Sequence, residues 1–281
     1  DRIKTHIYYS EGLYGELWRV DGQRNRKKNI KPQISKDRSP LRCNWLTPFI
    51  ISSHQATTLY YGSQYLFESN DRGDHWKQIS PDLSKNSNSK RGDVPFSTIT
   101  TISESGIKPG LIYVGTDDGN VWITRNNGDH WELINQQLPK NKWISRVVAS
   151  GFDLGTVYVS LNGYRDDDFE AYIFRSTNFG KTWVSIANNL PGGPINVVNE
   201  DPNYRDILYA GTDYGIYISL KNGQQWHSLN TNIPTTYIHD LFVHPRDHIL
   251  VAATHGRGLY ALDIASLPEF YRLNIEKFNS D

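Results

Sequence analysis

Short apolar runs that contain tyrosine recur along the chain, and turn residues bound each of them. These runs are Leu59–Ser63, Ile112–Thr116, Val157–Ser160 and Leu208–Thr212. Alternating, β-branched stretches precede them, for example residues 97–102 and 195–198. Alternation with a period of two, in short segments separated by turn signals, is typical of strands. The pattern predicts repeated units of four short strands each.

A polar eight-residue segment that ends in tryptophan follows each run. The four copies are residues 69–76, 124–131, 176–183 and 219–226, and their tryptophans are Trp76, Trp131, Trp183 and Trp226. An aliphatic residue stands three positions after each tryptophan: Ile79, Ile134, Ile186 and Leu229. Recurrence at roughly 40–55 residues indicates a repeat architecture.

Turn chemistry explains the residues that recur in the four copies of this octapeptide. An Asp or Asn at its third position can bond backbone N–H groups two residues on, and Gly at its fifth position supplies a positive φ. Tryptophan can cover the hairpin base while its N–H reaches a carbonyl. The fourth copy has Lys221 at the third position, which predicts a looser turn. We assign structural roles to Asp71, Gly73, Trp76, Asn126, Gly128, Trp131, Asn178, Gly180, Trp183, Gly223 and Trp226.

A repeated four-stranded unit without intervening helices is a β-propeller blade. We therefore predict an all-β propeller with four complete antiparallel blades and two partial ones. Residues 5–10 and 15–21 match second and third strands, and Asn29–Pro32 is expected to begin a fourth. Three strands at 238–245, 249–254 and 259–263 end the array. The predicted limits are a propeller over 1–268, with a partial blade at 1–40, blades at about 41–90, 91–140, 141–191 and 192–235, a partial blade at 236–268, and a tail at 269–281.

The repeats resemble the Asp-box, or BNR-repeat, β-propellers over roughly residues 6–264. The resemblance is greatest to the sortilin-like and xyloglucanase-like repeat proteins common among exported bacterial proteins. Two further phrases fit that group, residues 115–121 and 254–260. The resemblance implies an exported location, periplasmic, secreted or at the cell surface. It leaves function open, because Asp-box propellers include hydrolases, receptors and proteins of unknown role.

The partial ends allow two arrangements. The ends can complete each other in a six-bladed ring, or the chain can be part of a larger propeller protein. The chain contains no methionine, and the resembling proteins are much longer, which favours the second arrangement. An unclosed sheet edge would then pair with the rest of such a protein or with another subunit.

The composition of the chain argues against several classes of binding partner. Lys and Arg number 30, as do Asp and Glu, so net charge favours neither nucleic acid nor a membrane surface. The basic run Arg24–Lys28 is expected to be a solvated loop. No apolar stretch is long enough for a membrane span. Cys43, the one cysteine, is expected to be a buried, inert thiol, and no phosphate loop or metal-ligand spacing indicates a cofactor or metal.

Three segments are candidate binding sites. The first is an insertion with Arg165, Asp166, Asp167 and Asp168, whose carboxylates favour a solvated loop over a cation or partner contact. The second is Asp117 and Asp118, which we expect to serve a turn, because Asp213 holds the equivalent position. The third is His255 with Arg257, in a glycine-containing turn where Arg257 is expected to make a structural ion pair.

The leading functional hypothesis is a non-catalytic binding or scaffold propeller that engages a protein or glycan through loops at one end. The alternative is a glycoside hydrolase in which the chain forms one wall of a cleft, with Asp117, Asp118 or Asp166 among its carboxylates. A structural subunit with permanently paired edges is a third option. No residue matches the catalytic positions of the hydrolase relatives, so no catalytic residue is assigned.

Overall fold

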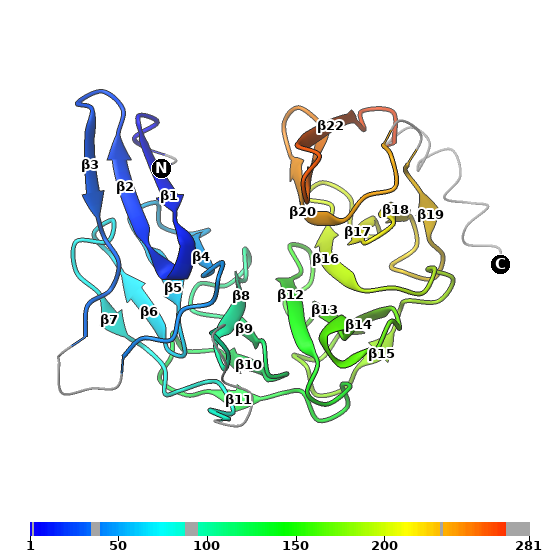
Figure 1. Ribbon diagram of the computed structural model, residues 1–281, viewed down its shortest axis with the longest axis horizontal. Coiled ribbons are helices and arrows are strands. Elements are labelled where there is room, and N and C mark those ends of the chain that lie inside the picture. Colours follow the sequence, from blue (N-terminus) through cyan, green and yellow to red (C-terminus); the bar gives the residue numbers. More distant parts are fainter. Residues whose placement is uncertain (2, 35–39, 88–94, 231–232, 268–281) are drawn as a thin grey trace. The chain divides into compact units, whose positions relative to one another are not determined.

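The computed structural model describes residues 1, 3–34, 40–87, 95–230 and 233–267, and almost all of its regular structure is antiparallel sheet (Figure 1). The predicted tail, 269–281, lies outside the described residues. Four sheets have four strands and two have three. Two short 3-10 turns, Leu13–Gly15 and Tyr164–Asp166, are the described helical segments discussed below.

Each sheet is a meander in which consecutive strands pair. The first sheet contains β1 (Ile7–Glu11), β2 (Leu17–Asp21) and β3 (Arg26–Asn29). The second contains β4 (Phe49–Ile51), β5 (Leu59–Gly62), β6 (Leu66–Ser69) and β7 (Lys77–Gln78). The third contains β8 (Ile99–Glu104), β9 (Ile112–Thr116), β10 (Val121–Thr124) and β11 (Glu132–Leu133).

The remaining sheets repeat this pattern. The fourth contains β12 (Trp143–Ala149), β13 (Val157–Asn162), β14 (Tyr172–Ser176) and β15 (Val184–Ser185). The fifth contains β16 (Ile195–Glu200), β17 (Leu208–Thr212), β18 (Gly215–Ser219) and β19 (His227–Ser228). The last contains β20 (Ile238–His244), β21 (Ile249–Thr254) and β22 (Leu259–Asp263). The predicted all-β propeller, with four complete and two partial blades, is confirmed.

The incomplete sheets lack different strands. Ile30, just after β3, donates its N–H to the Leu17 carbonyl (2.8 Å), as Ile79 after β7 donates to Leu66 (2.9 Å). The first sheet therefore holds the second, third and fourth strand positions of a blade, whereas β20–β22 hold the first three. The expected start of the fourth strand at Asn29 is wrong, because β3 spans Arg26–Asn29. It includes much of the basic run expected to be a loop, and all four of its residues are exposed.

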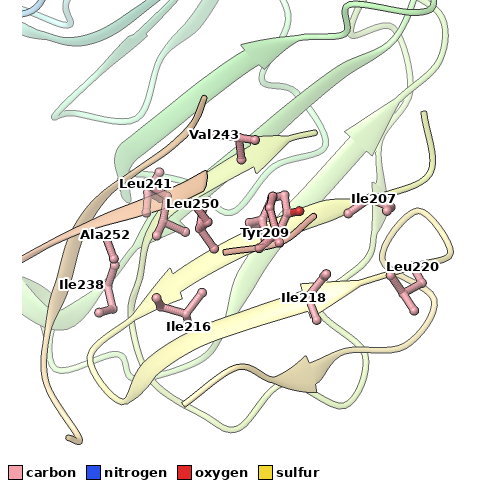
Figure 2. Packing of buried hydrophobic residues seen from close by; sticks show 12 residues of the cluster. Ile207, Tyr209, Ile216, Ile218, Leu220, Ile238, Leu241, Val243, Leu250 and Ala252 are labelled. Atoms are coloured by element: carbon pink, nitrogen blue, oxygen red, sulfur yellow. The ribbon is translucent and has the colours of Figure 1, made fainter. Parts of the chain in front are cut away.

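The chain divides into two compact units, residues 1–149 and 150–281. In the first unit, one apolar cluster joins Leu17 and Ile30 to Leu59 and Tyr61, so it links the first two sheets. In the second unit, a cluster joins residues of β17 and β18, such as Tyr209 and Ile216, to residues of β20 and β21 (Figure 2). In both cases the core is formed between successive sheets rather than within one.

The octapeptide tryptophans connect successive sheets through hydrogen bonds. The indole of Trp76 donates to the Ile30 carbonyl at 2.7 Å, and that of Trp131 donates to the Ile79 carbonyl at 2.9 Å. In the second unit, Trp226 donates to the Ile186 carbonyl at 2.8 Å. Each acceptor belongs to the aliphatic residue that ends the fourth strand of the preceding sheet, so the indole satisfies a backbone carbonyl between two sheets.

The octapeptide glycine packs against the same aliphatic residue of the preceding sheet that accepts the indole hydrogen bond. Gly128 has φ +94°, and a Cβ there would lie 2.3 Å from the Ile79 carbonyl oxygen. Gly223, with φ +82°, would meet Ile186 at 2.7 Å. Both the positive φ and the close approach therefore require glycine.

The turn is closed by the first octapeptide position as well as the third. The Ser69 hydroxyl accepts the Gly73 N–H at 2.8 Å, and Asp71 accepts the N–H of His75, four residues on, at 2.9 Å. The third position thus reaches four residues on rather than the expected two. In the fourth copy Ser219 still accepts the Gly223 N–H at 2.9 Å, although Lys221 supplies no acceptor.

Replacing Trp131 by Phe tests the link between sheets. The change keeps an aromatic ring but removes the donor to Ile79, leaving a carbonyl without that partner. We expect a loss of about 1–3 kcal/mol in the free energy of unfolding, measured by urea denaturation. His130→Ala, on an exposed neighbouring residue, is the control and should change stability by less than about 0.5 kcal/mol. Equal stability of the two variants would contradict the role given to the indole N–H.

Candidate functional site

Every candidate segment lies on a loop that joins the second and third strands of a sheet. Asp117 and Asp118 follow β9, residues 165–168 follow β13, and His255 and Arg257 follow β21. The equivalent loop of the first sheet is residues 12–16, between β1 and β2. Sequence repetition therefore places chemically different loops at equivalent positions of the scaffold, where binding residues commonly occur.

Asp117 is a buried internal acceptor. One carboxylate oxygen accepts the Thr98 N–H at 2.8 Å, and the other accepts the Thr98 hydroxyl at 2.7 Å and the Asn44 amide at 3.2 Å. Burial raises the pKa of Asp117 to about 7, although its hydrogen bonds with Thr98 act in the opposite direction. The carboxyl group connects the segment before β4 to the β9–β10 loop.

Asp118 is also buried and has different partners. It accepts the Thr116 hydroxyl at 2.6 Å and the backbone N–H of Lys85 at 2.7 Å. The adjacent carboxylates therefore serve two separate parts of the chain. Asp213, at the equivalent position of the fifth sheet, similarly accepts the Asn196 amide at 2.9 Å. These contacts support the turn role expected for the Asp117–Asp118 pair.

The acidic insertion forms a turn whose carboxylates do not converge. Asp166 ends a 3-10 turn, and Asp167 has φ +53°. Asp168 accepts the Tyr172 hydroxyl at 3.0 Å and the Glu170 N–H at 3.0 Å. Within the described ranges, no group of three His, Cys, Asp or Glu residues is arranged to hold a metal ion.

Tyr237 lies close to residues of several candidate loops in the second unit. Its ring lies 5.9 Å from that of His255, edge to face, and stacks 6.0 Å from that of His239. Burial raises the pKa of Tyr237 to about 12, with smaller effects from Asp213 and Tyr164 and an opposing one from Arg165. Tyr237 thus stays protonated near neutral pH. We call Tyr164, Arg165, Asp213, Tyr237, His239 and His255 the Tyr237 cluster.

The last candidate loop, between β21 and β22, carries His255 and Arg257. Gly256 and Gly258, with φ +85° and +78°, form the expected turn, and the Arg257 N–H bonds the Thr254 hydroxyl at 3.1 Å. The Arg257 side chain is exposed and makes no ion pair with any residue that the structure describes. The structural ion pair expected for Arg257 therefore stays a prediction.

The first unit carries an exposed aromatic pair that the sequence analysis did not single out. Tyr14 and Trp45 are 43% and 49% exposed, and their ring centroids lie 5.4 Å apart. Leu13 and Leu46 beside them in sequence are exposed to a similar extent. Large apolar side chains grouped in this way mark an interaction site more often than scattered ones do. We call these four residues the Tyr14–Trp45 platform.

The platform is held by polar contacts beneath it. Tyr14 has φ +57°, its N–H bonds the Trp45 carbonyl at 3.2 Å, and its own carbonyl accepts the Lys31 ammonium at 3.0 Å. The Thr47 N–H donates to Glu11, and burial raises the pKa of Glu11 to about 7. A non-glycine residue held at positive φ carries local strain, which often accompanies functional loops.

One sequence signal pointed to this platform. Trp45 lies outside the octapeptide copies, so its role in blade packing was not explained by them. Cys43, nearby, is buried as expected, and its thiol lies 3.2 Å from the Tyr61 hydroxyl. It lies six residues before the start of β4 at Phe49.

The BNR-Asp box repeat family model matches residues 173–186, which span the third octapeptide. The chain is thus a β-propeller that carries a BNR-Asp box repeat. It is 26% identical over 146 residues to the xyloglucanase Xgh74A of Acetivibrio thermocellus, covering 46% of this chain and 17% of that enzyme.

Two solved structures share the fold of this Asp-box propeller. The GH74 xyloglucanase of Xanthomonas campestris has a TM-score of 0.67 and 18% identity, over 94% of this chain and 44% of the enzyme. The extracellular domain of the one component system BT4673 from B. thetaiotaomicron has a TM-score of 0.60 and 17% identity, over 91% of this chain and 31% of that one. The chain thus spans less than half the length of each. No helix among the described residues is long and apolar enough to cross a membrane.

The buried carboxyl of Asp117 predicts a pH dependence of stability. Its folded-state pKa, about 7, exceeds the ordinary value of 3.8, so the folded protein binds the proton more tightly. Its contribution to stability is then greatest below pH 4 and is lost as pH rises to 7, by at most about 1.4 kcal/mol per pH unit. Asp117→Asn should remove this slope between pH 5 and 7 in urea unfolding.

Asp129→Asn, an exposed carboxyl on the same unit, is the matched control and should keep the slope of the unmodified protein. The slope difference between the two variants isolates Asp117, because Glu11 is present in both. Parallel stability profiles for the two variants would rule out a buried, proton-binding Asp117.

Proposed function

We propose that this Asp-box propeller is a non-catalytic binding protein that engages a glycan through the Tyr14–Trp45 platform. The observation that carries the proposal is the platform itself: an exposed aromatic pair contributed by two loops, with the Lys31 ammonium beside Tyr14. Aromatic rings offer large rigid apolar faces. The C–H faces of pyranose rings pack on such surfaces, while neighbouring polar groups bond the hydroxyls.

The Tyr237 cluster is a second proposed contact surface, in the other unit. It combines exposed Tyr164 with Arg165, whose guanidinium lies 4.6 Å from the Tyr164 ring centroid. Asp166, Asp167, Asp168 and Arg257 belong to the loops around it. Aromatic and arginine side chains dominate the energetics of many protein interfaces, so this surface suits a protein partner.

Internal bonding of the carboxylates favours binding over catalysis. Glycosidases need two carboxyl groups facing the scissile bond, but Asp117 and Asp118 are buried and bonded to backbone and side-chain donors. The alternative, a glycoside hydrolase, is favoured by the xyloglucanase relatives. An exported location is proposed from the extracellular domain that shares the fold, and the predicted blade limits remain proposals alongside it.

Glycan binding is tested by titrating xyloglucan and mixed-linkage β-glucan oligosaccharides into the chain by isothermal calorimetry. Trp45→Ala and Tyr14→Ala should each weaken binding roughly tenfold or more, as expected for a central aromatic contact. Tyr8→Ala is the control, because Tyr8 is an exposed tyrosine of the same unit on β1. Absence of binding to every glucan, or equal affinity of all three variants, would refute the platform proposal.

The hydrolase alternative makes a different prediction. Reducing ends should be released from xyloglucan by the longest available form of the protein, and Asp117→Ala, Asp118→Ala or Asp166→Ala should abolish the release. Binding without any release of reducing ends supports the non-catalytic function.

A further inference from the structure

Five sheets repeat one backbone contact at the start of the third strand. There, a carbonyl accepts the N–H of the aliphatic residue that ends the fourth strand. The pairs are Leu17 with Ile30, Leu66 with Ile79, Val121 with Ile134, Ile173 with Ile186, and Ile216 with Leu229, all at 2.8–2.9 Å. The five third-strand residues are at most 1% exposed. The contact is therefore part of the core of each complete repeat.

Leu259 holds the same position in the last sheet and is 74% exposed. Its register establishes the equivalence: Leu259 pairs with Ala253 as Ile216 pairs with Gly211, in both cases next to a bulge in the first strand. Among the strands that the structure describes, β22 pairs with β21 alone. No described backbone N–H bonds the Leu259 carbonyl.

The preceding sheet has a matching acceptor. Leu229 directly follows β19 just as Ile79 directly follows β7, and Ile30, Ile79 and Ile186 each accept an octapeptide indole N–H. Leu229 is only partly buried, and within the described residues no indole reaches its carbonyl. Among the described residues, the Leu259 carbonyl thus lacks the backbone N–H, and the Leu229 carbonyl lacks the indole N–H, that the equivalent carbonyls of other repeats accept.

The outer edge of β22 is able to form a ladder. The carbonyls of Gly258 and His248 accept the N–H groups of Thr254 and Ile264, so the even-numbered residues of β22 face β21. The N–H and C=O groups of Leu259 and Ala261 therefore face outward. Exposed edges are commonly blocked by lysine or proline, but Leu259, Tyr260 and Ala261 include neither.

We infer that the outer edge of β22 binds an added extended strand of octapeptide sequence. The strand adds to the sheet as its fourth member, in the mode of β-augmentation. Its aliphatic residue donates an N–H to Leu259, and its tryptophan, three residues earlier, donates an indole N–H to Leu229. The residue types expected in the added strand follow from the five carbonyl–N–H pairs that the other sheets form, and not from apolar exposure alone.

A labelled peptide copying Thr124–Pro139 tests the inference against the 281-residue chain by fluorescence anisotropy. This segment is the chain's own second octapeptide with its fourth strand, so it carries both donors. We expect saturable binding, weakened roughly tenfold or more when the peptide residue corresponding to Trp131 is replaced by Ala. The Ile134→Asp peptide should not bind. These changes leave the protein unaltered, so they do not depend on its folding.

Two protein variants locate the site. Leu259→Asp places a charge against the added strand, and Ala261→Pro removes an outward N–H without touching the ladder to β21; both should abolish peptide binding. Arg257→Ala, on the adjacent exposed turn, is the control and should bind normally. Hydrogen exchange should show slower exchange of the Ala261 amide on adding the peptide.

Three results would overturn the inference. One is undiminished binding to Leu259→Asp, and another is no binding by a chain that native mass spectrometry shows to be monomeric. The third is a different occupant: a dimer that Leu259→Asp breaks but the peptide does not displace would identify a strand of a second copy that is not an octapeptide. Binding only after deletion of residues 268–281 would identify the chain's own C-terminal segment.

Discussion

The hydrogen bond from an octapeptide indole to the aliphatic carbonyl of the preceding sheet organises this propeller. A single sheet of four short strands buries too little apolar surface to be stable alone. The indole crosses to the next sheet, satisfies a backbone group there, and places an apolar face over the junction. Gly128 lies against the same residue that Trp131 bonds. Local turn chemistry and packing between sheets are therefore set by the same eight residues.

Acidic side chains form a second type of link between sheets. Glu104, at the end of β8, accepts the Ser53 N–H at 2.7 Å and the Tyr60 hydroxyl at 3.2 Å, both from the preceding sheet. Glu200, at the end of β16, accepts the Gly151 N–H at 2.7 Å. Burial raises the pKa of Glu200. The scaffold thus uses polar bonds at strand ends, which leaves the loops between second and third strands to vary in chemistry.

Much of the fold could be predicted from the sequence, because each repeat encodes its strands and turn locally. The octapeptides, the alternating stretches and the apolar–tyrosine runs predicted four strands for each of the four complete sheets. The exposed strand β3 was missed because basic residues, with no apolar alternation, form an edge that needs no buried face. The Tyr14–Trp45 platform was missed for a different reason: it joins loops from two sheets, and only the folded chain brings Trp45 to Tyr14.

The spacing of the tryptophan links also bears on how the chain folds. Each indole and its acceptor are about 40–50 residues apart, as in Trp76 with Ile30 and Trp226 with Ile186. No link of this kind needs the distant end of the chain, so the entropy of closing each loop is similar and modest. Folding can then start at any neighbouring pair of sheets and spread outward, as in other repeat arrays. A chain emerging from the ribosome would be able to secure each blade as soon as the following octapeptide appears.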